Sequence, residues 1–274
     1  MADHNILLKY AILAAISAGE EILSVYELAH EVELKADKSP LTLADKKAHN
    51  KIIELLAVTG LPVLSEEGRD IPFEERQKWE SFWMVDPLDG TREFIKKNGE
   101  FTVNIALIEN EKAILGVIYV PVTDTLYFGA TWVPSCMHHH AADSLRNEKS
   151  ADAWYELMMG AAIKLPLNPS DRSFTVVASR SHLSPETEIF IETLREKQGT
   201  LDFISSGSSI KICLVAEGRA DIYPRLAPTM EWDTAAGQAI AENAGCQVTN
   251  FHTGQAVTYN KADLLNPHFV VQRL

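Results

Sequence analysis

The stretch from residue 83 to residue 94, WMVDPLDGTREF, constrains the fold more than any other part of the chain, because an apolar strand leads directly into charged residues. Its first residues are aromatic and β-branched, which predicts a short buried strand. Asp86 stands at the carboxyl end of that strand, where open α/β sheets bind their ligands. Pro87 turns the chain sharply, so Asp89 is expected to return towards Asp86 and to leave the carbonyl of Leu88 free. The sequence therefore predicts an α/β fold with acidic oxygen atoms gathered at a strand end.

The residues around this turn favour a metal ion with a phosphate beside it. Two carboxylates in a half-buried pocket repel each other unless a cation lies between them, and ligands that are all oxygen select a hard ion such as Mg²⁺. Gly90 lets a ligand approach the backbone, and Thr91 is expected to be the N-cap of a helix whose free N–H groups attract an anion. Pro-Leu-Asp-Gly is also ordinary turn chemistry, so a turn without a ligand is the alternative for these residues alone.

Two other segments place carboxylates in similar positions. A strand expected over residues 62–65 ends at Glu66 and Glu67, although a solvated acidic loop is the alternative there. Asp233 begins an expected helix, for which it would also serve as an ordinary N-cap. The small residues 235–237 indicate that the start of this helix packs tightly against another segment.

Cations that could bind an anion lie in the second half of the chain. One segment opens a helix with two hydroxyls and a lysine, which would form a phosphate cradle without being a P-loop. Another follows an expected strand and precedes a helix, with a solvated loop as the alternative. The candidates are Gly207, Ser208, Ser209 and Lys211 in the first segment, Arg180 and His182 in the second, and Arg225 after a later strand.

A tract of three histidines, residues 138–140, raises the question of a transition-metal site. Adjacent side chains point in different directions and cannot all bind one ion without a special loop, so a surface tract is expected. The sequence contains no HExxH, GxGxxG or EF-hand motif, nor a serine nucleophile elbow.

Composition excludes several classes of protein. The 274 residues are 46% hydrophobic and 23% charged, which indicates a globular chain, and the formal charge of −13 disfavours nucleic acid polymers and anionic membranes as partners. Residues 5–25 are apolar, but Glu20 and Glu21 interrupt them and no basic segment precedes them, so we expect an amphipathic helix and no signal peptide or membrane span.

Three cysteines without a CxxC pattern favour the cytoplasm.

Hydrophobic patterning outlines the order of the elements. Strands are expected over residues 62–65, 81–85, 101–109, 113–121, 125–130, 174–179, 200–205, 221–224 and 269–272. Helices are expected over residues 6–28, from near residue 42, and over residues 151–159, 185–197, 208–217 and 233–244. The first half is expected to contain an antiparallel meander, the charged residues 69–80 an exposed connection, and the second half alternating β and α elements.

We expect three regions along the chain. Residues 1–133 would form an N-terminal α+β half that carries the metal motifs, residues 134–170 an insertion or linker, and residues 171–274 a C-terminal α/β half.

Glu66, residues 86–91 and residues 232–237 together resemble the signature of the inositol monophosphatase superfamily of Mg²⁺-dependent, lithium-sensitive phosphatases. Longer stretches resemble one branch, the bacterial 3'(2'),5'-bisphosphate nucleotidases. These stretches are residues 39–45, 64–67, 98–104, 179–182, 207–209 and 214–218. The resemblance covers nearly the whole chain except residues 132–168, which are longer and richer in histidine than expected.

The resemblance implies a layered α/β/α/β/α sandwich of the inositol monophosphatase and sugar phosphatase type. It also implies two or three Mg²⁺ ions, with Asp45 and Thr91 orienting and deprotonating the attacking water and Glu66 taking part in catalysis. The implied metal ligands are the side chains of Glu66, Asp86, Asp89 and Asp233 and the carbonyl of Leu88. The implied substrate contacts are Leu88, Asp89, Gly90, Thr91 and Asp233, together with the candidates of the second half named above.

The reaction implied is removal of the 3'-phosphate from adenosine 3',5'-bisphosphate, giving AMP and phosphate, with 3'-phosphoadenylyl sulfate as a second substrate. This would clear a by-product of sulfate assimilation. A phosphatase for inositol or sugar monophosphates is the alternative within the superfamily, and a metal-dependent nucleotide-binding protein without turnover is the alternative of another class. Association with the periphery of the inner membrane and the oligomeric state are left open.

Overall fold

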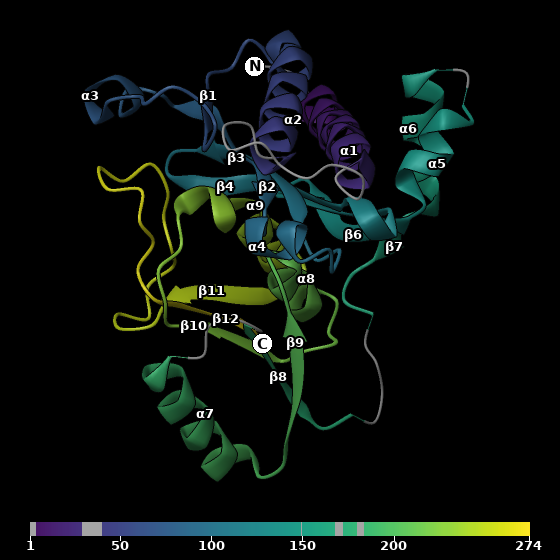
Figure 1. Cartoon of the computed structure of the whole chain (residues 1–274). Coiled ribbons are helices and arrows are strands. Elements are labelled where there is room, and N and C mark those ends of the chain that lie inside the picture. The colour runs from purple at the N-terminus through teal and green to yellow at the C-terminus, as the bar shows by residue number, and fades with distance from the viewer. Residues whose placement is uncertain (1–3, 29–39, 149, 168–171, 180–183) are drawn as a thin grey trace.

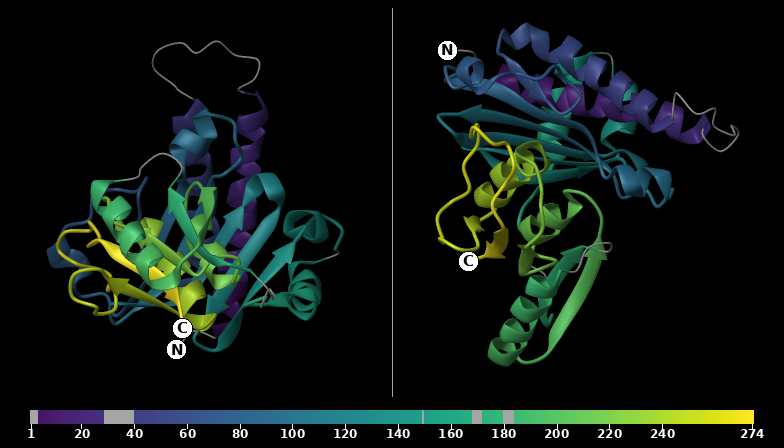
Figure 2. Two further views of the ribbon diagram at one scale, coloured as in Figure 1. Left: turned by 90° about the horizontal axis from the view of Figure 1, so that it is seen from below. Right: turned by 60° about the vertical axis from the view of Figure 1, so that its left-hand side comes forward.

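The computed structural model describes residues 4–28, 40–148, 150–167, 172–179 and 184–274. Two sheets lie roughly one above the other, with helices between them and on their outer sides (Figures 1 and 2). The order of the layers is α1 and α2, the first sheet, α8 and α9, the second sheet, and α7. This is the layered α/β/α/β/α arrangement that the family resemblance implies, and the fold class is confirmed.

The first sheet has seven strands in chain order. Its strands are β1 (Val63–Ser65), β2 (Ser81–Asp89), β3 (Thr102–Glu109), β4 (Lys112–Val120), β5 (Thr125–Ala130), β6 (Val133–His139) and β7 (Ile163–Lys164). β1 runs parallel to β2, and every later pair is antiparallel. The predicted meander is therefore confirmed.

Apolar side chains on both faces of the first sheet explain its position inside the molecule. In β2, Trp83 and Val85 join the core beneath α1 (His4–Leu28) and α2 (Pro40–Leu56), whereas Phe82 and Met84 join the core of α8 (Ile210–Ala216) and α9 (Ala235–Asn243). Successive residues of a strand point to opposite faces, so a strand with no polar face is buried from both sides.

The second sheet is mixed and has the order β11, β12, β10, β8, β9. Its strands are β8 (Phe174–Ser179), β9 (Leu201–Ser206), β10 (Ile222–Arg225), β11 (Cys246–Asn250) and β12 (Phe269–Arg273). α7 (Pro185–Gln198) covers its outer face, where Ile191 joins a small core with Val176 and Ile222. Ser184 caps α7 by accepting the N–H of Thr187, and Pro185 supplies the first helical residue, so the start of this helix follows from its sequence.

The shorter helices connect these layers. They are α3 (Phe73–Arg76), α4 (Thr91–Ile95), α5 (Ala141–Arg146) and α6 (Ala151–Ala161), together with the 3₁₀ turns η1 (Ala57–Thr59), η2 (Pro121–Thr123) and η3 (Glu231–Asp233). Among the described helices, none combines the length and apolar character that crossing a membrane requires.

The structure corrects several local expectations. β2 does not end at Val85 but continues to Asp89, with a shift in its pairing to β3 after Asp86. Thr91 is the first helical residue of α4 instead of its N-cap. Gly90 takes the N-cap position with φ = 95°, a left-handed angle that suits glycine.

Three further segments differ from the sequence interpretation. Residues 69–80 were expected to be exposed, yet they contain α3 and the buried Arg76. β6 was not expected, because its polar and histidine-rich sequence lacks a clear alternation. β11 was missed for a similar reason, since only two of its five residues are buried.

Candidate active site

The last residues of β2, from Asp86 to Asp89, carry the acidic oxygen atoms that the sequence predicts there. The side chain of Asp86 is buried, and its Oδ1 accepts the N–H of Leu88 at 3.0 Å. This bond closes the turn over Pro87 on the carboxylate itself, which fixes the direction in which Asp86 points. The pairing shift between Asp86 and Asp89 marks the same turn in the sheet.

Glu66, Asp86 and Asp233 come together from three distant parts of the sequence. Each offers a carboxylate oxygen, and these three atoms lie within 4.8 Å of one another. The N–H of Glu66 donates to the carbonyl of Val85 at 3.1 Å, which ties the end of β1 to β2. The structure therefore brings together three of the four side chains that the resemblance names as metal ligands.

Asp233 reaches this cluster from η3. Its Oδ2 accepts the N–H of Met230 at 2.9 Å, so the carboxylate folds back over its own turn. The N-cap of α9 is Thr234, and the alternative interpretation of Asp233 as that N-cap is wrong. Ala235 and Ala236 are buried, and a side chain at Gly116 of β4 would place its Cβ 2.1 Å from the carbonyl oxygen of Ala236. The predicted tight packing of this helix start is confirmed.

The electrostatics of the cluster indicate that it is built for a cation. Burial raises the pKa of Asp86 well above its usual range, and the neighbouring carboxylates of Asp89, Glu66 and Asp233 raise it further. Burial and the nearby Asp89 raise the pKa of Asp233 to about 8. Carboxylates that are buried beside one another and supply only oxygen atoms fit a hard divalent ion. The residues present thus fit the metal that the resemblance implies.

Asp89 has a different environment from Asp86. Its Oδ2 accepts the N–H of Ser209 at 2.6 Å, and the hydroxyl of Ser209 donates to Asn104 Oδ1 at 2.7 Å and lies 2.8 Å from the hydroxyl of Thr102. Burial raises the pKa of Asp89, while Lys211 acts in the opposite direction. Ser209, expected to contact substrate, therefore also orients Asp89.

A cavity of about 290 Å³ opens beside Asp89 and Asp233. Of the residues predicted to contact substrate, it is lined by Asp89, Gly90, Thr91, Gly207, Ser208, Ser209, Lys211, Arg225 and Asp233. Leu88 is buried behind them, and Arg180 and His182 lie outside the described residues.

Three cations line this cavity, the exposed Arg92 and the more buried Lys211 and Arg225. Lys211 is 5% exposed and donates to the carbonyl of Ser208 at 2.5 Å, and burial lowers its pKa to about 8. Arg225 donates from Nη2 to the carbonyl of Pro228 at 2.9 Å. Its buried Nε atom has no hydrogen-bond partner within the described part of the chain, and neither has the hydroxyl of Thr229 in the same wall. These groups leave hydrogen-bond donors available to an anion.

Asp45 and Thr91, the pair expected to act on the attacking water, lie on two different helices, α2 and α4. Asp45, on α2, is 8% exposed, and burial together with Glu67 and Glu66 raises its pKa to about 7. Thr91, on α4, is exposed and lines the cavity. α2 and α4 contact each other.

Sequence reasoning missed several residues of the cavity wall. Glu93, Tyr223 and Thr229 line it, and Asn104 supports Asp89 from β3. Asn104 could have been found, because it pairs with Asp86 across the antiparallel β2 and β3. Glu93 lies on α4, Tyr223 on β10 and Thr229 in the loop after β10, and the sequence does not specify how these segments face the cavity.

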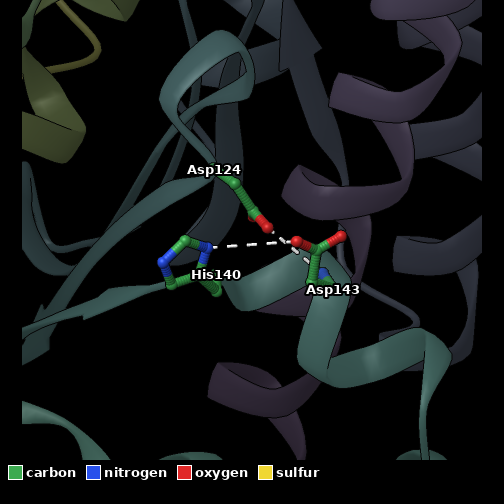
Figure 3. Close-up of side chains that lie close together, drawn as sticks. All are labelled: Asp124, His140 and Asp143. Atoms are coloured by element: carbon green, nitrogen blue, oxygen red, sulfur yellow. Dashed lines mark hydrogen bonds and ion pairs between the residues drawn. The ribbon is translucent and has the colours of Figure 1, made fainter.

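The histidine tract lies at the end of β6, where His139 and His140 are exposed. Figure 3 shows His140 beside Asp124 and Asp143, with ligand atoms within 4.8 Å of one another. The carboxylate of Asp124 accepts the N–H groups of Ala142 at 2.7 Å and of Asp143 at 3.1 Å. Asp124 therefore caps the start of α5, which accounts for this group of side chains without a metal.

The chain is similar to several known proteins over nearly its whole length. A 3'(2'),5'-bisphosphate nucleotidase CysQ of Salmonella typhimurium is 44% identical over 264 residues, which cover 94% of this chain and 96% of the relative. CysQ of Escherichia coli strain K12 is 43% identical with the same coverage. The crystal structure of CysQ from Bacteroides thetaiotaomicron, a bacterial member of the inositol monophosphatase family, has a TM-score of 0.90 at 52% identity and covers 96% of each chain. The model of the inositol monophosphatase family matches residues 3–273, and the chain belongs to this family.

Proposed function

We propose that the chain is a Mg²⁺-dependent 3'(2'),5'-bisphosphate nucleotidase that converts adenosine 3',5'-bisphosphate to AMP and phosphate. The observation that carries the proposal is a cavity whose wall holds the carboxylates of Asp89 and Asp233 and the cations Arg92, Lys211 and Arg225. The relatives named CysQ support the choice of substrate. The family is metal-dependent, and the acidic residues cluster here as such an enzyme needs.

The residues divide into groups with different tasks. Glu66, Asp86, Asp89, Asp233 and the carbonyl of Leu88 would hold two or three Mg²⁺ ions. When bound, Mg²⁺ neutralises charge on the phosphoryl group and lowers the pKa of water. Thr91 would orient the attacking water from the cavity wall, and Asp45 would accept its proton. Because burial and Glu67 raise the pKa of Asp45 to about 7, this carboxylate suits proton exchange near neutral pH.

Lys211 and Arg225 would hold the second phosphate of the substrate. Burial lowers the pKa of Lys211, and repulsion from the nearby positive charge of Arg225 lowers it further. A phosphate bound between them would relieve this repulsion and would use the free Nε donor of Arg225. Arg180 and His182, together with Gly207, Ser208 and Ser209, complete the proposed subsite.

A cytoplasmic location is part of the proposal. It is supported by the three cysteines, all of which are free and buried, as thiols are in a reducing compartment.

The test is phosphate release with Mg²⁺ from adenosine 3',5'-bisphosphate, 3'-phosphoadenylyl sulfate, inositol 1-phosphate and fructose 1,6-bisphosphate. We expect the highest kcat/KM for adenosine 3',5'-bisphosphate and no release in excess chelator. A preference for inositol or sugar phosphates would instead assign the chain to the other phosphatases of the family. Nucleotide binding without release would identify a binding protein.

A further inference from the structure

Glu231 is a fully buried carboxylate two residues before Asp233, at 0% exposure, and both residues belong to η3. Its side chain accepts the backbone N–H of Asn260 at 2.6 Å and the backbone N–H of Lys261 at 3.1 Å. The ammonium group of Lys261 also pairs with it. Glu231 therefore fixes one side of η3 to the segment that precedes β12.

Arg76 holds that segment from the other side. This guanidinium is 2% exposed, and it donates from Nη1 to Asn260 Oδ1 at 2.8 Å and from Nη2 to the carbonyl of Ala262 at 2.9 Å. The side-chain amide of Asn260 returns a bond to the carbonyl of Arg76 at 2.9 Å. Arg76 ends α3, so the bonds join the first half of the chain to the loop drawn in yellow in Figures 1 and 2.

The backbone of the turn is tied to the same loop. The N–H of Glu231 donates to the carbonyl of Leu264 at 2.9 Å, and the N–H of Asn266 donates to the carbonyl of Thr229 at 2.8 Å. The side-chain amide of Asn266 donates to the carbonyl of Met230 at 2.7 Å. Because Met230 supplies the N–H that orients Asp233, these bonds reach the carboxylate in the metal cluster after one further step.

The buried group formed by Glu231, Arg76 and Asn260 is polar, and this indicates a role beyond stability. Burying a carboxylate and a guanidinium is costly, and apolar side chains of similar volume often stabilise a fold equally well. Directional bonds, in contrast, define where the backbone lies, and side chains that orient metal ligands usually control metal affinity. An apolar contact in place of Glu231 would leave η3 free to shift relative to Glu66 and Asp86.

We propose that Glu231, with Arg76 and Asn260, is a positioning residue that sets Asp233 in the metal cluster and thereby determines metal affinity. The inference rests on the proposed function because it takes Asp233 as a metal ligand. Glu231 itself does not contact substrate or metal.

The test compares Glu231→Gln with Glu217→Gln. Glu217 is also buried, at 2% exposure, and it accepts the hydroxyl of Tyr127 at 2.5 Å. Within the described part of the chain its carboxylate bonds to Tyr127 and Arg219 and not to η3. Mn²⁺ binding is measured by calorimetry in each full-length protein, and the unfolding midpoint is measured without metal. We expect Glu231→Gln to weaken Mn²⁺ binding by about tenfold or more. Glu217→Gln should lower the midpoint comparably and leave the affinity unchanged.

A milder variant covers the case in which Glu231→Gln does not fold. Lys261→Met removes only the ammonium group from a side chain that is 31% exposed. It should weaken Mn²⁺ binding by about two- to fivefold, which is less than the loss expected when a group that orients a metal ligand is removed completely. Wild-type affinity in Lys261→Met and in any folded Glu231→Gln protein would overturn the positioning role, as would equal losses in Glu217→Gln. Failure of the wild type to hydrolyse the bisphosphate while it binds Mn²⁺ would overturn the proposed function alone.

Discussion

Lys211 tests the choice of substrate at the level of one residue. Lys211→Met keeps the apolar stem but removes the charge, so KM for adenosine 3',5'-bisphosphate should rise by about 10- to 100-fold, equivalent to a charged hydrogen bond of about 1.5–3 kcal/mol. Cleavage of 3'-AMP, which lacks the second phosphate, should barely change. Lys164→Met, at an exposed position of β7, is the control and should affect neither substrate. Equal losses with both nucleotides would place Lys211 at the reacting phosphate.

Thr91 tests the division between catalysis and metal binding. Thr91→Ala removes the hydroxyl from the cavity wall and should lower kcat by about 10², the usual scale for losing help with proton transfer. Thr91→Ser should restore most of the rate, because the hydroxyl returns. Mg²⁺ binding, measured by calorimetry, should remain close to that of the wild type in both variants. A Thr91→Ala protein that binds Mg²⁺ weakly but keeps its rate would show that Thr91 serves the metal.

At the level of elements, the sequence predicted the parts whose pattern is local. Strands such as β3 and β5 are rich in apolar residues and are bounded by polar turns, and the turn of Asp86 and Asp89 has proline and glycine at fixed positions, so both could be predicted. Arg76 could not, because a charged residue in a charged stretch gives no sign that Asn260 lies next to it in space. β6 could not either, since its neighbours β5 and β7 determine its place in the sheet more than its own residues do.

The contact between α9 and β4 gives a prediction for these two elements. A Cβ at Gly116 would lie 2.1 Å from the carbonyl oxygen of Ala236, so Gly116→Ala forces the helix backbone away from the sheet. We expect a loss of about 1–3 kcal/mol in the free energy of unfolding, as for other overpacked cores, measured by denaturant titration.

Gly160→Ala is the matched control for that substitution. Gly160 lies in α6, and a Cβ there meets no atom within 4 Å, so this change should stabilise the protein by about 0.5–1 kcal/mol. A Gly116→Ala protein as stable as the wild type would show that α9 can move without cost. In that case tight packing would not be what places the start of α9.

On the scale of the whole molecule, the two halves share one core. Apolar residues of β2, β3, α8, α9 and β12 form a single cluster between the two sheets. The acidic cluster lies where these layers meet, because Asp86 belongs to β2, Glu66 directly follows β1, and Asp233 lies in η3, just before α9. The three regions proposed from the sequence, 1–133, 134–170 and 171–274, remain a prediction, although β6 and β7 place parts of the middle region in the first sheet.

This arrangement makes the stability of the metal-free protein depend on pH. The pKa of Asp233 is raised to about 8 and that of Asp45 to about 7, whereas both lie near 3.9 in the unfolded chain. Between about pH 4 and pH 7 the folded state therefore binds more protons than the unfolded state, and the contribution of these groups to stability falls as the pH rises. Lys211, with its pKa lowered to about 8, acts in the opposite direction only above that pH.

Asp86→Asn isolates this effect from the other carboxylates of the chain. The variant removes one of the repelling charges, so in excess chelator its melting temperature should exceed that of the wild type at pH 8 and approach it at pH 5. Saturating Mg²⁺ should raise the wild-type melting temperature most at pH 8, because the ion takes the place of the protons, and should raise that of Asp86→Asn much less. Thermal unfolding at the two pH values, with and without Mg²⁺, gives all of these differences. If Asp86→Asn were less stable than the metal-free wild type at pH 8, the carboxylates would not repel one another there, and the cluster would be held together by its own hydrogen bonds instead of by a metal.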